Sequence, residues 1–229
     1  MPKTDYFANS YSIQIENLVR LLIRMKLNTS KILNNLEKVL ENYEESYDIK
    51  IRELEQKNKT AIIELEDSVN KIIALSHPVA FDLRFLLSSI KISSEIHYIS
   101  SWARKTVSAV QRISKENINQ NTKKDLLEML RISIFTLKDV ISTLLNFDSK
   151  KKADNEILFK LDILLEKDNL VDEIYRKVLQ HELSSIKENN INPLDVFEII
   201  GMAKNFEKIS DCINNMIITT RYVLTGKRV

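Results

Sequence analysis

The sequence is poor in the residues that build tight turns. It contains 2 glycines and 3 prolines among 229 residues, whereas these two types together make up about 12% of an average protein. Sandwiches, barrels and βαβ units need such turn residues at short intervals along the chain. The scarcity argues against these architectures, and we therefore expect an all-α protein.

Cysteine and long apolar runs are also scarce. The single Cys212 has no second cysteine in the chain with which to form a disulfide, so nothing indicates an oxidising compartment. The first residues lack the apolar core of a signal peptide, and charges interrupt every apolar run well before the ~20 residues that a membrane-spanning helix requires. We therefore expect a cytoplasmic protein that reaches a membrane through a partner.

Neither sign of charge is in large excess. The 34 basic and 32 acidic side chains leave a net charge of +2, which is too small to indicate nucleic-acid binding by electrostatics. The sequence also lacks a glycine-rich phosphate loop, a nucleophile paired with a base, and a Cys/His metal cluster. It therefore predicts a protein that is not an enzyme and has no nucleic-acid partner.

What the sequence does contain is helical periodicity. Apolar residues recur at positions i, i+3, i+4 and i+7 over long stretches, as in residues 158–186. Pro78 and the pair Asn192-Pro193 have the form of helix starts, and Gly226 suits a helix end. These signals predict six long helices, at about residues 6–43, 45–76, 78–114, 122–148, 154–188 and 193–224.

The order of these helices looks duplicated. Residues 92–107 overlay residues 202–217 with apolar side chains at matching places, and each half ends in an acidic helix followed by a proline-started helix. The pattern predicts two repeated antiparallel three-helix bundles, residues 1–116 and 117–229.

Four carboxylates at helical spacing form the candidate site. Asp168 and Asp172 lie near the centre of an apolar stripe, and Glu207 and Asp211 repeat their spacing on the next helix. Carboxylates inside a bundle need Arg, Lys, a metal ion or a water-filled cleft opposite them. Hard oxygen ligands on two facing helices suit Mg, Mn, Ca or non-haem Fe. No histidine lies near these carboxylates in the sequence, which argues against zinc. The alternative is a solvated acidic face without metal.

Four ordered segments resemble the PhoU family of phosphate-uptake regulators. They read ALSHPVAFDLR at 74–84, EKDNLVDEIY at 166–175, AKNFEKISD at 203–211 and YVLTG at 222–226. The resemblance implies two three-helix bundles with paired Glu/Asp-x-x-x-Asp motifs that bind metal clusters. It also implies a negative regulator that links an ABC-type phosphate transporter to a sensor histidine kinase. A homodimer is a further expected assembly.

Carried over residue by residue, the resemblance implies a metal site in the second half only. The four matching positions are Asp168, Asp172, Glu207 and Asp211. The metals implied are iron, manganese, magnesium and zinc, in that order of preference. The corresponding positions of the first half hold a single carboxylate and are Glu55, Lys59, His97 and Ser101.

The departures in the first half predict an ion pair in place of a metal. Glu55 precedes Lys59 by four residues, which is the favourable order for a pair within one helix. His97 is either a metal ligand or a structural residue. The family's glycine before the final Asp is serine here, at Ser100 and Ser210, which removes a close helix approach. Two other functions stay open: a metal-dependent helical enzyme or metal-storage protein, and a metal-free helical adaptor.

Overall fold

The computed structural model describes residues 3–78, 80–113, 118–145, 155–187 and 192–227. Across these ranges the chain forms six helices and no strand, so the all-helical prediction is confirmed. Each helix lies within a few residues of its predicted bounds. The helices are α1 (Lys3–Glu41), α2 (Glu45–Ser76), α3 (Ala80–Arg112), α4 (Gln120–Leu145), α5 (Asn155–Lys187) and α6 (Pro193–Thr225).

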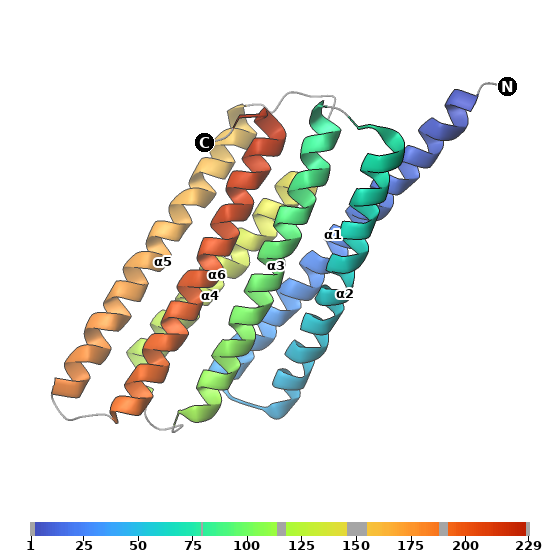
Figure 1. Cartoon of the computed structure of the whole chain (residues 1–229). Coiled ribbons are helices and arrows are strands. Elements are labelled where there is room, and N and C mark those ends of the chain that lie inside the picture. Colours follow the sequence, from blue (N-terminus) through green and yellow to red (C-terminus); the bar gives the residue numbers. More distant parts are fainter. Residues whose placement is uncertain (1–2, 79, 114–117, 146–154, 188–191, 228–229) are drawn as a thin grey trace.

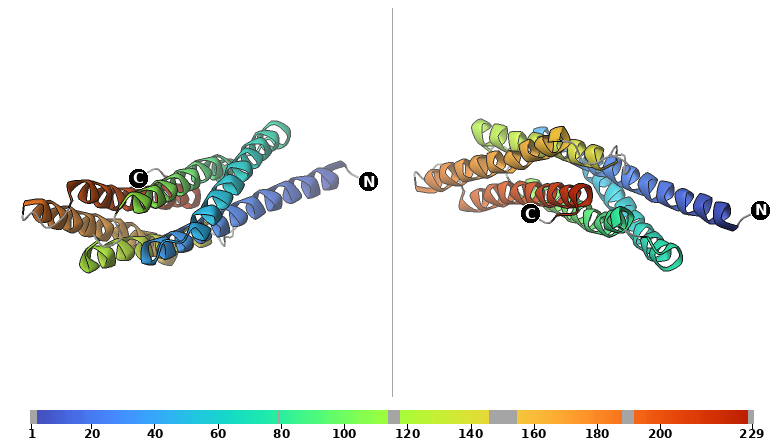
Figure 2. Two further views of the ribbon diagram at one scale, coloured as in Figure 1. Left: turned by 90° about the horizontal axis from the view of Figure 1, so that it is seen from below. Right: turned by 90° about the horizontal axis from the view of Figure 1, so that it is seen from above.

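The helices form two triads of long, roughly parallel rods (Figure 1). Helices α1, α2 and α3 pack against one another, and so do α4, α5 and α6. The triads meet where α3 packs against α6 and α1 packs against α4, while α2 and α5 lie on opposite flanks (Figure 2). The equivalence of residues 1–116 and 117–229 as repeats stays a prediction. None of the described helices combines the length and the apolar composition needed to cross a membrane.

One continuous apolar core runs through both triads. Its residues recur at helical spacing, as in Leu18, Leu22 and Met25 of α1, and each of these is at most 1% exposed. Phe206 of α6 is the largest fully buried side chain. Fully burying a side chain of this kind stabilises the folded state by about 1.5–3 kcal/mol. The apolar stripes predicted from the sequence therefore explain why the helices pack together.

The start of α6 follows the prediction. Pro193 is the first residue of the helix, where its missing N–H costs nothing. The side-chain oxygen of Asn192 accepts a hydrogen bond from the Leu194 N–H at 3.0 Å and so caps the helix.

The end of α6 follows the prediction as well. Gly226 adopts a φ of +71°, and its N–H donates to the Tyr222 carbonyl at 2.8 Å. This left-handed conformation is the one that favours glycine after a helix.

The junction between α2 and α3 differs from the prediction. Pro78 was expected as the first helical residue, but α3 begins at Ala80. His77 closes α2 with a φ of +47°, and Ala80 has a φ of +50°. A proline disfavours right-handed helical conformation in the residue before it, which explains why α2 breaks at His77.

Candidate metal centre

The four predicted carboxylates lie on α5 and α6, two on each helix. Burial raises the pKa of Asp168, a hydrogen bond from Ser210 lowers it, and the charges of Asp211, Asp172 and Glu207 raise it further. The other three carboxylates therefore all lie close enough to Asp168 for their charges to act on it. The fold brings together the two motifs that the sequence placed on separate helices.

Asp168 is held by two uncharged donors from α6. The Ser210 hydroxyl donates to Oδ1 at 2.6 Å, and the Asn214 amide donates to Oδ2 at 3.1 Å. Among the described residues Asp168 has no ion-pair partner. The two donors satisfy its hydrogen bonds, but they leave its negative charge uncompensated. Neither donor was assigned this role from the sequence, because their meeting with Asp168 depends on how α5 and α6 pack.

The two carboxylates of α6 carry their own counter-charges. Lys204 Nζ lies 2.8 Å from Glu207 Oε2, and Lys208 Nζ lies 3.5 Å from the same atom. Lys208 also donates to Asp211 Oδ2 at 2.7 Å. The spacing of three residues between partners was visible in the sequence, and it was the signal that could have identified these lysines.

The donor set suits a hard cation, but its present arrangement does not form a ligand shell. In the described part of the chain, no three His, Cys, Asp or Glu side chains lie close enough to share one metal ion. Arg176 lies 3.7 Å from Asp172, so three of the four carboxylates are already paired. Glu207 Oε2 is buried and accepts no well-aligned hydrogen bond despite its ion pair. A cation would have to displace the ammonium groups, and the metal site stays a prediction.

The first triad compensates its buried acid differently. Glu55 is 5% exposed; Lys59 Nζ lies 3.1 Å from its Oε1, and Arg104 Nε lies 3.3 Å from its Oε2. The predicted Glu55–Lys59 ion pair is confirmed. Arg104 was missed because it comes from α3 and has no sequence relation to Glu55. The other two positions, His97 and Ser101, are half-buried on α3.

Glu95 of α3 lies where the two triads meet, against α6. The Cys212 thiol and the Asn215 amide of α6 donate to its carboxylate. Burial raises the pKa of Glu95, and both hydrogen bonds lower it. Burial and the nearby Glu95 charge also raise the pKa of the Cys212 thiol, which therefore stays protonated and unreactive. Nothing in the motif spacing pointed to Glu95.

Comparison with known sequences shows similarity to one family. Residues 126–219 match the PhoU domain, and this segment contains all four carboxylates. Over 206 residues, the chain is 24% identical to the phosphate-specific transport system accessory protein PhoU homolog 1 of Thermotoga maritima, covering 90% of this chain and 85% of the relative. The PhoU homolog of Borreliella burgdorferi is 25% identical over 214 residues, covering 93% and 86%. Residues 126–219 therefore form a PhoU domain, and the chain resembles PhoU homologs along most of its length.

Solved structures show that the PhoU fold extends over the whole chain. PhoU from Pseudomonas aeruginosa superposes with a TM-score of 0.83 at 18% identity, covering 95% of this chain and 100% of the other. The phosphate transport system regulatory protein PhoU from Streptococcus pneumoniae gives a TM-score of 0.78 at 17% identity, covering 97% and 99%. The first triad therefore shares the PhoU fold, with Glu55 as the one carboxylate at its four corresponding positions.

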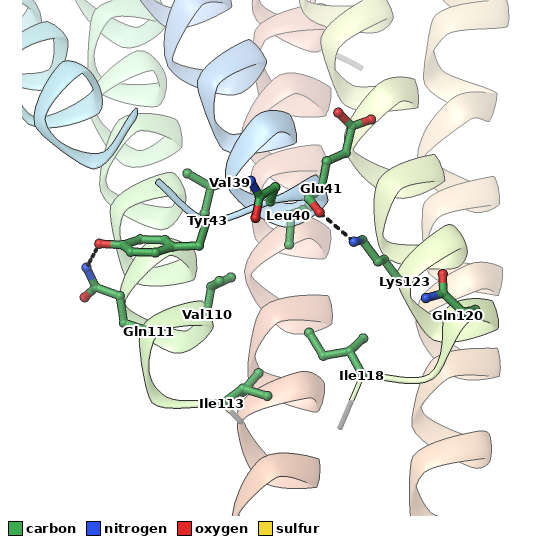
Figure 3. Close-up of a pocket in the computed structure, with 11 residues that line it drawn as sticks. Val39, Leu40, Glu41, Tyr43, Val110, Gln111, Ile113, Ile118, Gln120 and Lys123 are labelled. Carbon is green, nitrogen blue, oxygen red and sulfur yellow. Dashed lines mark hydrogen bonds between the residues drawn. The ribbon is translucent and has the colours of Figure 1, made fainter. Parts of the chain in front are cut away.

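A separate hollow lies at one end of this PhoU bundle, where the α1–α2 turn meets the end of α3 and the start of α4 (Figure 3). Its volume is about 460 Å³. At its edges Gln111 donates to the Tyr43 hydroxyl at 2.6 Å, and Lys123 donates to the Glu41 carbonyl at 2.7 Å. The lining includes none of the four motif carboxylates, so this hollow adds nothing to the candidate metal centre.

Proposed function

We propose that this chain is an accessory regulator of phosphate transport that represses phosphate uptake or phosphate-starvation signalling. The observation that carries the proposal is its similarity to accessory proteins of phosphate-specific transport systems along most of its length. The absence of a catalytic constellation in the sequence supports a non-enzymatic role. We place the protein in the cytoplasm, as a homodimer or a monomer.

Its partners are subunits of an ABC-type phosphate transporter and a sensor histidine kinase. A regulator of this kind works through surfaces, because it has to change the activity of other proteins and performs no chemistry itself. The long bundle offers several exposed apolar side chains for such contacts, among them Phe159 of α5 and Phe197 of α6, which are 65% and 74% exposed. Contact with the membrane then runs through the transporter.

The second triad is the part that we assign to metal binding. Asp168, Asp172, Glu207 and Asp211 would hold a divalent or trivalent ion, and the cation would supply the positive charge that Asp168 lacks. Bound metal would therefore tie α5 to α6 by charge compensation. The first triad has a carboxylate–lysine–arginine cluster in the corresponding place and would stay free of metal.

A metal-free adaptor is the second candidate. The observation that favours it is the neutralisation of Glu207 and Asp211 by Lys204 and Lys208. With these lysines in place the α6 carboxylates need no metal. The partners and the regulatory role would be the same for the metal-binding regulator and for the metal-free adaptor.

Deleting the gene and measuring phosphate uptake tests the proposed function. Cells without the protein should keep taking up phosphate in phosphate-replete medium, and a plasmid copy should restore the repression. The tagged protein should also co-purify with the nucleotide-binding subunit of the transporter. Unchanged uptake at high and low phosphate, together with no transporter subunit in the pull-down, would overturn the proposal.

A further inference from the structure

A basic groove lies between α1 and α2. Helix α2 is on the opposite flank of the bundle from α5 (Figure 1). The volume of the groove is about 380 Å³, within the range of small-ligand pockets. We call it the lysine groove. It is lined by Lys31, Asn34, Asn35, Lys38, Lys50, Glu53, Leu54 and Lys57.

The positive charge of the lysine groove is largely uncompensated. All four lysines are exposed, and none of them makes an ion pair with a carboxylate of the described residues. Glu53 is the one carboxylate in the lining, and Glu37 on α1 is paired with Arg131 at 2.5 Å. A hollow that gathers four ammonium groups against one carboxylate concentrates positive potential and attracts anions.

The four ammonium groups are arranged at two ends of the groove. Lys31 and Lys38 are seven residues apart on α1, as are Lys50 and Lys57 on α2, and seven helical residues span about 10 Å. Near one end, Asn28 donates to Asn58 at 3.1 Å, which sets the pairing of the two antiparallel helices. This pairing brings Lys31 and Lys57 to the same end and leaves Lys38 and Lys50 at the other.

The second pair of lysines lies near the ring of Tyr47. Lys38 Nζ lies 5.5 Å from the centre of the Tyr47 ring, and Lys50 Nζ lies 5.4 Å from it. Attraction between an ammonium group and an aromatic ring favours this position for each lysine. Both ammonium groups therefore lie near one ring at this end of the groove, and the ring neutralises neither of them.

We propose that the lysine groove binds a short linear chain of phosphoryl groups. One orthophosphate is too small to reach lysines about 10 Å apart, whereas a chain of phosphoryl groups can place negative charge at both ends. Lysine binds phosphate as a point charge on a flexible stem, and Asn34 and Asn35 add amide donors between the two ends. The lining contains no aromatic side chain, so the groove offers no ring on which a nucleobase could stack.

Calorimetric titration of the full chain tests this proposal. Inorganic tripolyphosphate should bind at least about tenfold more tightly than orthophosphate, because it reaches both ends of the groove, and its affinity should fall steeply with salt. ATP should bind within about threefold of tripolyphosphate, because the base contributes nothing. A tighter complex with single-stranded DNA, or with ATP by more than about tenfold, would overturn the proposal in favour of recognition of a nucleic acid or a nucleoside.

Variants at each end locate the site. Lys31→Gln/Lys57→Gln and Lys38→Gln/Lys50→Gln should each weaken tripolyphosphate binding about tenfold or more. The matched control, Lys71→Gln/Lys124→Gln, removes two exposed charges outside the groove and should change affinity less than about twofold. Circular dichroism and thermal unfolding without ligand should be the same for all three. Equal losses in the control and the groove variants, or no loss in either groove variant, would refute the site.

Discussion

Arg104 Nε lies 3.3 Å from the carboxylate of Glu55, across the interface between α2 and α3. Together with Lys59 it gives this buried acid two counter-charges. In the second triad, Asp168 is held by a hydroxyl and an amide, neither of which is charged. Both triads thus place an acid between their last two helices. The first triad compensates the acid with positive charges, whereas the second surrounds it with uncharged hydrogen-bond donors.

Replacing Arg104 by Gln should destabilise the protein by about 1–2 kcal/mol, because Glu55 would keep its buried charge with Lys59 alone beside it. Urea unfolding of the wild type and the variant measures the change. The double variant Glu55→Gln/Arg104→Gln should recover part of the loss, since it removes the charge along with its partner. Equal stability of wild type and Arg104→Gln would show that this contact contributes nothing.

Replacing Asp168 and Asp172 together by Asn should abolish metal uptake, because it removes both α5 ligands. The metal-free double variant should also be more stable than the metal-free wild type, since fewer like charges face one another. Elemental analysis of protein purified under metal-replete conditions decides this, with His97→Ala as the control. Metal kept by the double variant but lost by His97→Ala would place the site in the first triad. A wild type without metal would favour the metal-free adaptor.

Neutralising the lysines of α6 should have the opposite effect on metal. In Lys204→Gln/Lys208→Gln, no ammonium group competes for Glu207 and Asp211, so metal affinity should rise about tenfold. Titration of Mn²⁺ followed by calorimetry measures the affinity. Lys160→Gln/Lys177→Gln on α5, which removes equal charge away from the α6 carboxylates, is the matched control. Equal affinities in both variants and the wild type would mean that Lys204 and Lys208 do not compete with metal.

Glu95→Gln should stabilise the protein near neutral pH, and the gain should disappear in acid. Burial raises the pKa of Glu95, and Asp211 raises it too, while Lys91 and the donors Cys212 and Asn215 lower it. An acid with a raised folded-state pKa destabilises the fold wherever it is ionised. The cost is present above the folded-state pKa and vanishes below the unfolded value of about 4.3.

Urea unfolding of wild type and Glu95→Gln across this pH range checks the prediction. The difference in unfolding free energy should be largest at pH 7 and should close towards pH 4. A difference that grows in acid would contradict the sign of the shift.

The two glycines should respond to alanine in opposite directions. Gly226→Ala should cost about 1 kcal/mol, because Gly226 has a φ of +71° and its added Cβ would lie 3.4 Å from Arg84. Gly201 lies inside α6 with no neighbour within 4 Å of an added Cβ, so Gly201→Ala should stabilise by about 0.5–1 kcal/mol. Thermal unfolding of the two variants compares them directly. Stabilisation by Gly226→Ala would contradict the left-handed helix end.

The sequence by itself determined the local features of this protein. The number of helices, most of their ends and the Glu55–Lys59 pair were predicted correctly, because each depends on residues within one or two helical turns of each other. The start of α3 was placed wrongly at Pro78, since the left-handed conformation of His77 and the restriction before proline shift it to Ala80. Similarity to the PhoU family was also predicted, from four segments whose order and spacing the sequence displays.

The tertiary structure alone decided which side chains meet across helices. Arg104 reaches Glu55, and Ser210 and Asn214 reach Asp168, only because α3 packs on α2 and α6 packs on α5. Sequence spacing contains no information about such pairs, because the rotation and sliding of one helix against another are set by the packing of many apolar side chains at once. The lysine groove depends on packing in the same way. Its four lysines lie in pairs on α1 and α2, and the antiparallel packing of these two helices brings the pairs together.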